Sequence, residues 1–543
     1  LSTVIERAGK GLRMGCLAHS HKEVPARMSS LTQRKPRRRS EVGQQSSARR
    51  SAYPRHSEPA TGRRIASNFA FLSLAELICR ANSVFVSLSL MKRLGVVGYG
   101  RIEFAFNVVF WLVLLVRDSS DVIVARELSR HPRLIKPLVD RVLALKGLFA
   151  LALFSGLTLV GTLTLRDSTD WWVLTLYGLM LFTTASGLDF VYRGTECMGL
   201  LAISLCLRTS IYAVGVLAWV GGARQIVWVP IWLAIGEASG IALVWLHYLR
   251  NYRAPRPRLG FRFLTILMQR GRTVCVIQLS QAVISTADLM VVGLLSSWWD
   301  VGRYGAPHRM VTALLTFGLI FQQAAFPTLA RLWRQTAQAG REALDSLVEV
   351  LVTALLPVAI GTTILAEPLV RLLPEDYAGA GLLLALGIWR APLLILAFLY
   401  QTTLIALNRE TVGVRSLLLA ALGIGPVVAL LRIYFGLPGA ASGVILLGLA
   451  LVVAGYASLA REGRHPAWHH HLARPLAASL VMVPVCLALK RWHVLLAVLG
   501  GAVTYALVLL SLGGLHRTRL WRSAWHAPPV STAGPVSPIS RPE

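Results

Sequence analysis

The chain has 543 residues, of which 55% are hydrophobic and only 15% are charged, and its formal net charge is +30. Soluble domains carry about 25% charged residues and are joined by polar linkers, so this composition excludes a soluble multidomain protein. The positive charge does not indicate a nucleic-acid partner. Much of it lies in the N-terminal segment and between apolar stretches, where the positive-inside rule expects it in a membrane protein.

The N-terminal segment is polar and basic, with runs such as RKPRRR at residues 34–39. It contains no apolar core of a secretory signal peptide, so we expect a disordered cytoplasmic tail over 1–64. Its basic side chains are expected to bind anionic lipid head groups weakly.

Apolar stretches of about 20 residues follow one another after this tail, and each is long enough to cross about 30 Å of hydrocarbon. We therefore predict an all-α integral membrane protein with about fourteen transmembrane helices. The predicted spans are 67–91, 102–124, 140–164, 171–192, 199–220, 226–249, 273–296, 308–327, 343–366, 381–406, 414–435, 440–460, 473–489 and 492–512. The last two are the least distinct, because only Lys490 and Arg491 separate them.

The loops that follow even-numbered spans carry about twice as many lysines and arginines as the others, which predicts that both termini lie in the cytoplasm. The first outer loop, with Lys92, Arg93 and Arg101, goes against this rule. All predicted loops are short, which argues against a membrane polymerase or ligase that needs a catalytic loop.

An internal repeat divides the chain. LGVVGYGRIEFAFNVV surrounds Tyr99 and WDVGRYGAPHRMVTAL surrounds Tyr304, and an Ala-Arg pair ends each following span, at Arg126 and Arg331. Both separations, 304 − 99 and 331 − 126, equal 205. The repeat predicts two parallel six-helix lobes around a central cavity, unless it is a coincidence of glycine-rich turns. The predicted parts are an N-lobe at 65–250, a basic linker at 251–272, a C-lobe at 273–460, two further helices at 461–512 and a cytoplasmic tail at 513–543.

Three segments resemble polysaccharide and O-antigen flippases of the multidrug/oligosaccharidyl-lipid/polysaccharide exporter superfamily. They are NFAFLSLAELICRANSVFVSLSLMKRLGVVGYGRIEFAF, DVIVARELSR, and QAVISTADLMVVGLLSSWWDVGRYGAPHRM with its continuation AAFPTLARLW. The resemblance covers roughly residues 65–512, and its loose motifs identify the superfamily better than the substrate.

The resemblance implies two six-helix bundles, two additional C-terminal helices and location in a bacterial inner membrane. It also implies that an undecaprenyl-pyrophosphate-linked oligosaccharide is flipped from the cytoplasmic to the outer leaflet, for the synthesis of lipopolysaccharide O-antigen or another surface polysaccharide. A polysaccharide polymerase and glycosyltransferases of the same pathway are the expected partners. Another exporter of the superfamily, such as a lipid II flippase or a drug/cation antiporter, and a membrane polymerase or ligase remain alternatives.

Ionisable residues near the middle of predicted spans are candidates for the transport site, because a buried charge usually faces a cavity or a partner. We predict that Arg80, Arg208 and Arg390 contact substrate phosphate or sugar, since guanidinium groups match phosphate oxygens. Glu76 and Glu237 are candidates for coupling to protons or sodium. Alternatively, Glu76–Arg80 and Arg208–Glu237 are ion pairs that only hold helices together. No partner for Arg390 is evident from the sequence.

A second charged group lies near the predicted cytoplasmic ends and is interpreted as a structural inner gate network. Its members are Arg117, Asp118, Asp121, Lys146 and Asp189. Asp288 belongs to the family-like segment of the seventh span, and we interpret it first as structural and second as an ion-coupling residue.

The sequence has no P-loop and no GxSxG or HExxH motif, so we predict neither a cofactor nor enzymatic activity. No metal site is predicted, since none of the six cysteines forms a CxxC pair and the histidines at 469–471 have no nearby carboxylate or cysteine. Transport must then use an ion gradient, the membrane potential or the substrate flux.

Overall fold

The computed structural model describes residues 58–513, except for residues 118–119, 132–133, 166, 196 and 467. Asp118 and almost all of the two predicted tails therefore lie outside the described residues, as do the side chains of the histidine run at 469–471. Within the described part of the chain the structure is helical throughout and contains no strand.

The helices of the N-lobe are α2 (Glu58–Arg117), α3 (Asp121–Arg130), α4 (Ile135–Thr164), α5 (Ser168–Ser186), α6 (Asp189–Gly194), α7 (Met198–Trp219) and α8 (Trp228–Asn251). The helices of the C-lobe are α9 (Phe261–Leu295), α10 (Trp298–Gln335), α11 (Ala337–Val370), α12 (Gly381–Gly387), α13 (Arg390–Ala406) and α14 (Glu410–Ala460). The helices α15 (Trp468–Leu489) and α16 (Val494–Ser511) follow, and the turns η3 (Ala223–Gln225) and η4 (Glu375–Tyr377) are short 3₁₀ helices.

Two of the long helices are each a pair of spans. α2 turns at Gly95 (φ 66°) and α14 turns at Gly436 (φ 70°), conformations that glycine adopts without steric cost. Ten helical segments of the described chain are long and apolar enough to cross a membrane, and α14 is counted once among them. Four more segments are added to these ten: the second half of α14, the two halves of α2 and the long helix α10. The total is about fourteen spans, which confirms the prediction.

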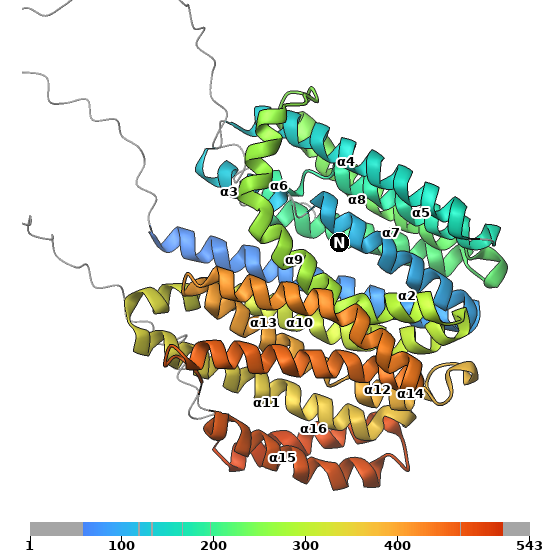
Figure 1. Cartoon of the computed structure of the whole chain (residues 1–543), viewed down its shortest axis with the longest axis vertical. Helices are drawn as coiled ribbons and strands as arrows, with labels where there is room; N and C mark the ends of the chain where they lie inside the picture. Colours follow the sequence, from blue (N-terminus) through green and yellow to red (C-terminus); the bar gives the residue numbers. More distant parts are fainter. Residues whose placement is uncertain are drawn as a thin grey trace, which may run out of the picture.

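Figure 1 shows the N-lobe helices on one side of the bundle and the C-lobe helices on the other, with α2 and α9 between them. Helix α2 packs on α5 and α7 of its own lobe and on α9 and α10 of the other lobe. Helices α15 and α16 pack on each other and on α11, at the edge of the C-lobe (Figure 1). The interface between the lobes is therefore built mainly from α2, α9 and α10.

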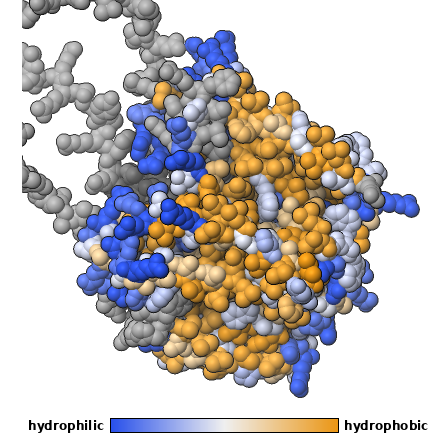
Figure 2. Space-filling view, in the orientation of Figure 1, coloured by the Kyte–Doolittle hydropathy of each residue, from blue (hydrophilic) through white to orange (hydrophobic). Residues whose placement is uncertain are grey.

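The outer surface is that of a multi-pass membrane protein. Figure 2 shows a broad band of hydrophobic side chains on one face, with hydrophilic side chains toward its edges. Leu163, Leu419 and Leu499 are 78, 70 and 63% exposed within the protein. Contiguous exposed apolar surface of this kind is rare on water-soluble monomers and is covered by lipid in membrane proteins.

The connection between the lobes is shorter than the linker predicted at 251–272, because α9 already begins at Phe261. The remaining segment is held against the N-lobe by Asp140 of α4. The Asp140 carboxylate accepts a hydrogen bond from the backbone N–H of Arg256 (2.8 Å), and the Asp140 carbonyl accepts one from that of Arg258 (3.0 Å). This end of the bundle, which also holds the start of α2 and the end of α16, is called the terminal end, and the opposite end is called the Gly95 end (Figure 1).

Candidate functional site: a cavity between the lobes and three charge clusters

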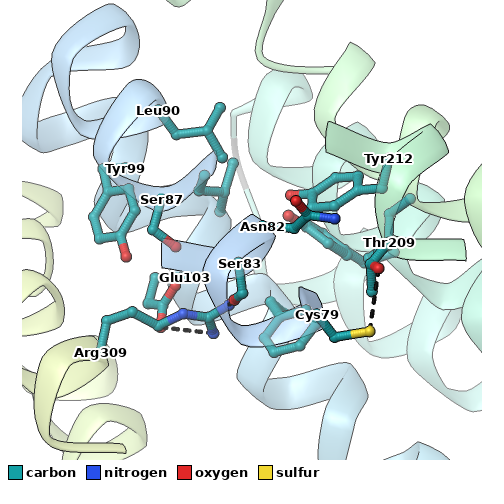
Figure 3. Close-up of a pocket in the computed structure, with 14 residues that line it drawn as sticks. Cys79, Asn82, Ser83, Ser87, Leu90, Tyr99, Glu103, Thr209, Tyr212 and Arg309 are labelled. Atoms are coloured by element: carbon teal, nitrogen blue, oxygen red, sulfur yellow. Dashed lines mark hydrogen bonds and ion pairs between the residues drawn. The ribbon is translucent and has the colours of Figure 1, made fainter. Parts of the chain in front are cut away.

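A cavity of about 160 Å³ lies where α2 meets α10 (Figure 3). Its wall comes from both halves of α2, from α5, α7 and α8 of the N-lobe, and from α10 of the C-lobe. The lining residues are Cys79, Asn82, Ser83, Ser87, Leu90, Tyr99, Ile102, Glu103, Phe106, Tyr177, Thr209, Tyr212, Leu233 and Arg309.

Arg309 is the charged group that the C-lobe contributes to this cavity. Its guanidinium lies 3.9 Å from the Glu103 carboxylate, donates a hydrogen bond of 2.9 Å to the Ser83 hydroxyl, and stands over the Phe106 ring (Figure 3). All three partners are on α2. Because the Glu103 side chain is 9% exposed and that of Arg309 is 34% exposed, the cation reaches the cavity while the carboxylate is largely covered.

Arg80 and Glu76 lie beside the cavity on the first half of α2. Their side chains are 3.8 Å apart, one turn of helix from each other, and each is about one-third exposed, at 34 and 32%. The Arg80 guanidinium is close enough to Arg309 for the two to repel each other, although Arg80 does not line the cavity itself. The predicted pair therefore forms, and its arginine adds positive potential next to Arg309.

The rest of the wall is rich in hydroxyl groups and aromatic rings. The rings of Tyr177 and Phe106 meet edge to face, with centroids 5.9 Å apart. Asn82 donates a hydrogen bond to the Ser210 hydroxyl (3.3 Å), and Cys79 contacts the Thr209 hydroxyl (3.3 Å). Such a lining offers hydrogen bonds to hydroxylated groups, while Arg309 offers charge-assisted hydrogen bonds to phosphate oxygens.

The model of the family described as "Polysaccharide biosynthesis protein" matches residues 65–333, which include the N-lobe, α9 and most of α10. The chain belongs to this family. No curated protein matches the sequence significantly.

Solved transporter structures share the fold of this family member. The lipid II flippase MurJ in an inward closed conformation has a TM-score of 0.66 at 13% identity, over 82% of this chain and 99% of that chain. An inward-facing multidrug resistance MATE family transporter of the MOP superfamily has a TM-score of 0.60 at 11% identity, over 72% and 94%. The Vibrio cholerae MATE transporter VcmN has a TM-score of 0.53 at 17% identity, over 74% and 98%. These identities show the fold alone, which the chain shares with these three transporters.

A second cluster, within the N-lobe, centres on Arg208 of α7. Its guanidinium contacts Asp189 of α6 at 3.1 Å and Glu237 of α8 at 3.3 Å, and its Nε donates to the Ser204 hydroxyl at 3.2 Å. The predicted pair with Glu237 therefore forms. Asp189, which we assigned to the inner gate network, joins the same cluster because the short helix α6 packs against α7. With all these contacts made inside the N-lobe, Arg208 lies outside the cavity wall.

The other members of the predicted inner gate network lie close to this cluster. Lys146 of α4 forms a buried ion pair with Asp121 at the start of α3. Arg117 at the end of α2 interacts electrostatically with both Asp121 and Glu237. These charges join α2, α3, α4 and α8 near the terminal end, in the manner of a structural network.

A third cluster is sealed inside the C-lobe and is called the Asp288 cluster. One oxygen of Asp288 (α9), Oδ2, accepts hydrogen bonds from Tyr304 (α10) at 2.6 Å and from Arg390 (α13) at 2.7 Å. Arg390 also donates to the Thr312 hydroxyl at 3.3 Å. This partner was not evident from the sequence, because Asp288 lies 102 positions away and only the fold brings the two together. Arg390 is 3% exposed and does not reach the cavity between the lobes.

Arg309 and Glu103 were not predicted as site residues, because each is the second residue of a predicted span, whereas the candidates lie near the middle of spans. In the structure α10 already begins at Trp298 and the helix of Glu103 begins after Gly95, so both residues lie well inside. The repeat offers a signal that could have found them. Glu103 and His308 are related by the same separation, 308 − 103 = 205, and Arg309 follows directly.

The two lobes touch closely at the Gly95 end. A Cβ atom added to Gly100 would lie 2.2 Å from the Trp298 carbonyl oxygen, and one added to Gly302 would lie 2.0 Å from the Val96 carbonyl oxygen. The Trp298 indole also donates a hydrogen bond to Asp170 of α5 at 3.0 Å. The backbones of α2 and α10 are therefore in direct contact here, and the cavity is closed toward this end.

Proposed function

We propose that the protein flips a lipid-linked oligosaccharide with a pyrophosphate head group across a bacterial inner membrane, by alternating access, for the synthesis of a surface polysaccharide. In this proposal both termini lie in the cytoplasm and the substrate passes from the cytoplasmic to the outer leaflet. Glycosyltransferases and a polymerase of the same pathway would supply and consume it.

The contact of Arg309 with Glu103 and Ser83 carries the proposal. It lies in a hydroxyl-lined cavity between the lobes and joins the C-lobe to α2. A phosphate group that binds Arg309 competes with Glu103, since the phosphate and carboxylate anions repel each other beside one guanidinium. Substrate binding therefore weakens a contact between the lobes, which is what a transporter requires of its substrate when it changes conformation.

The size of the cavity also supports alternating access. Its volume of about 160 Å³ is well below the roughly 300–1,000 Å³ of ordinary ligand pockets, so an oligosaccharide does not fit in this conformation. The lobes must separate to admit it. The direct backbone contact at the Gly95 end implies that entry takes place toward the terminal end.

A drug/cation antiporter is the second candidate from the same fold. Arg309 and Arg80 disfavour a cationic substrate, because an approaching cation meets two guanidinium groups at the cavity. A lipid II flippase needs the same phosphate chemistry, so lipid II serves as one of the test substrates.

The test is leaflet exchange in liposomes. Purified protein is reconstituted with a fluorescent undecaprenyl-pyrophosphate-linked oligosaccharide, and an impermeant quencher reports the fraction in each leaflet. We expect fast exchange with the wild type, loss with Arg309→Ala and partial rescue with Arg309→Lys. Arg432→Ala is the matched control, because Arg432 pairs with Asp300 inside the C-lobe (3.3 Å), away from the cavity.

Exchange that survives Arg309→Ala would move the phosphate site elsewhere. Absence of wild-type exchange with several lipid-linked sugars, combined with transport of an organic cation, would replace the proposal with the antiporter. Faster exchange of lipid II than of the oligosaccharide would assign the substrate to peptidoglycan synthesis.

A further inference from the structure

Tyr99 carries a hydroxyl group that the fold does not use. Its side chain is 1% exposed, and its oxygen lies near Ser87 and Glu103 without forming a hydrogen bond of normal geometry with either (Figure 3). Buried polar atoms are nearly always paired, and an unpaired one costs stability. Since Tyr99 lines the cavity between the lobes, the partner that it lacks can come from a molecule in that cavity.

The repeat accounts for this unused hydroxyl. Tyr304, at the equivalent position of the C-lobe, donates a hydrogen bond to Asp288 in the Asp288 cluster. The residue 205 positions before Asp288 is Ser83, and its hydroxyl accepts a hydrogen bond from Arg309. The N-lobe therefore has no carboxylate at the position that receives the tyrosine proton in the C-lobe, and its tyrosine faces the cavity instead.

Two layers of polar groups follow each other along α2 in the cavity wall (Figure 3). The charged layer consists of Ser83, Glu103 and Arg309, and the hydroxyl layer consists of Ser87 and Tyr99. The two halves of α2 run in opposite directions from the turn at Gly95, so the hydroxyl layer lies four residues nearer to the Gly95 end on both halves. Four residues of helix correspond to a rise of roughly 6 Å. A substrate that enters from the terminal end therefore meets the charged layer first.

The chemistry of a glycosylated lipid pyrophosphate matches this order. Its phosphate oxygens fit the guanidinium of the charged layer. The first sugar is joined to phosphate through its anomeric carbon, so its ring hydroxyls lie next to the phosphate and within reach of a layer roughly 6 Å away. A sugar hydroxyl both accepts and donates hydrogen bonds, as do the hydroxyls of Tyr99 and Ser87. Both members of the hydroxyl layer are neutral, which disfavours a second phosphate there.

We propose that Tyr99 is a specificity-determining residue, which selects the glycosylated lipid over the same lipid pyrophosphate without a sugar. Its hydroxyl donates a hydrogen bond to the first sugar, while the pyrophosphate stays at Arg309. The sugar thus lies toward the Gly95 end and the phosphates lie toward the terminal end. The lipid without a sugar leaves the Tyr99 hydroxyl unpaired and binds less tightly. This inference rests on the proposed flippase function, since it takes the phosphate at Arg309 from that proposal.

The experiment compares two lipids that differ only in the sugar. They are undecaprenyl pyrophosphate with and without one N-acetylglucosamine residue, each with a fluorescent label on the lipid chain. The dissociation constant of each lipid is measured by titration of the protein in nanodiscs, and the ratio of the two constants is the sugar preference. We expect the wild type to prefer the glycosylated lipid.

Tyr99→Phe should reduce the sugar preference by about three- to tenfold, as expected for the loss of one hydrogen bond between neutral groups. Its affinity for the lipid without a sugar should stay unchanged, because the phenyl ring keeps the shape of the wall. Tyr248→Phe is the matched control. The Tyr248 hydroxyl is also buried and unpartnered, but it lies on α8 outside the cavity wall, so its removal should leave the preference intact.

Ser87→Ala covers the case in which Tyr99→Phe does not fold, because it removes the other hydroxyl of the same layer and should reduce the same preference. An unchanged preference in folded Tyr99→Phe, or in Ser87→Ala if that variant alone folds, would overturn the proposal. The Tyr99 hydroxyl would then be paired only with water in the cavity. A wild type that binds both lipids equally would overturn it as well.

Arg309→Ala separates this inference from the proposed function. It should weaken the binding of both lipids by the same factor and leave the sugar preference as it is. If Arg309→Ala changes neither affinity, the phosphate site of the proposed function fails, while a preference lost in Tyr99→Phe still assigns the sugar contact to Tyr99. If the preference depends on Arg309 and not on Tyr99, the sugar lies in the charged layer and the proposed order of the layers is wrong.

Discussion

The two lobes carry related polar clusters that the repeat places at equivalent positions. Tyr99 corresponds to Tyr304, Glu103 to His308 and Ser83 to Asp288, each pair being 205 residues apart. In the N-lobe this set faces the cavity, and its acid, Glu103, meets Arg309 from the other lobe. In the C-lobe the set is sealed, and its acid, Asp288, meets Arg390 from the same lobe.

The difference shows how equivalent positions of the repeat can serve two purposes. An ion pair across the lobes breaks whenever the lobes separate, so it can respond to a substrate in the cavity. An ion pair inside one lobe persists through the same motion and keeps that lobe rigid.

The largest expected effect is on the free energy of unfolding, and it distinguishes Arg390 from Arg309. Arg390→Ala leaves the Asp288 charge buried and unpaired, which should lower the free energy of unfolding by about 3–5 kcal/mol. Arg309→Ala should lower it by less, about 1–3 kcal/mol, since the Glu103 carboxylate that it leaves is only 9% exposed but lines a cavity. Thermal unfolding in detergent measures both.

The control for this contrast is Asp288→Asn combined with Arg390→Met, which removes both charges and should recover part of the loss. Equal destabilisation by the two single arginine variants would mean that the lobes do not differ in this way.

A matched pair of tyrosine variants tests the comparison at equivalent positions of the repeat. Tyr304 donates to the Asp288 carboxylate, and losing a hydrogen bond to a charged group costs about 1.5–3 kcal/mol. The buried Tyr99 hydroxyl makes no such bond, so Tyr99→Phe should cost less than about 1 kcal/mol. The measurement is the shift of the denaturation midpoint of each variant from that of the wild type. Equal shifts for Tyr304→Phe and Tyr99→Phe would refute the comparison.

The contact at the Gly95 end provides the next test. A methyl group at Gly100 would overlap the Trp298 carbonyl. Gly100→Ala should therefore increase the population of molecules whose lobes are open at this end by about tenfold. This change corresponds to about 1.4 kcal/mol. Cys79 in the cavity wall is a native probe: its labelling by an impermeant thiol reagent from the Gly95 side should accelerate.

Gly156→Ala is the control for this test, because nothing lies within 4 Å of an added Cβ there, and Cys79→Ser shows which cysteine reacts. If Gly100→Ala leaves the labelling rate unchanged, the close backbone contact does not hold the cavity closed.

The local features of this structure can be predicted from the sequence more fully than the contacts between residues that lie far apart in the chain. Apolar length predicts the spans, because a helix of given length must cross the bilayer wherever it packs. The pair Glu76–Arg80 could be predicted because residues four apart share a helix face. The connection around Gly95 was read as a loop, although glycine there lets the chain turn sharply between two helices.

The charge pairs that distinguish the lobes could not be predicted in this way. Asp288 and Arg390 come from different helices, and Glu103 and Arg309 come from different lobes. Which helix faces which depends on the packing of α2, α9, α10 and α13, and hydropathy does not encode it. For this reason Arg390 was predicted to bind substrate, while Arg309, which reaches the cavity, was not among the predicted site residues.

The smallest expected effect bears most directly on the substrate. If Glu103 is the group that phosphate displaces from Arg309, then Glu103→Gln removes a charged competitor and should tighten binding of a pyrophosphate-bearing lipid by about three- to fivefold, or less than about 1 kcal/mol. Release should slow by a similar factor, because the carboxylate no longer helps to expel the phosphate. Glu367→Gln is the control, since Glu367 is 46% exposed and pairs with Arg371 on the surface. Binding is measured by fluorescence titration of the labelled lipid. Weaker binding would assign Glu103 to the sugar, as an acceptor for its hydroxyl groups, and would leave Arg309 without a competitor in the cavity.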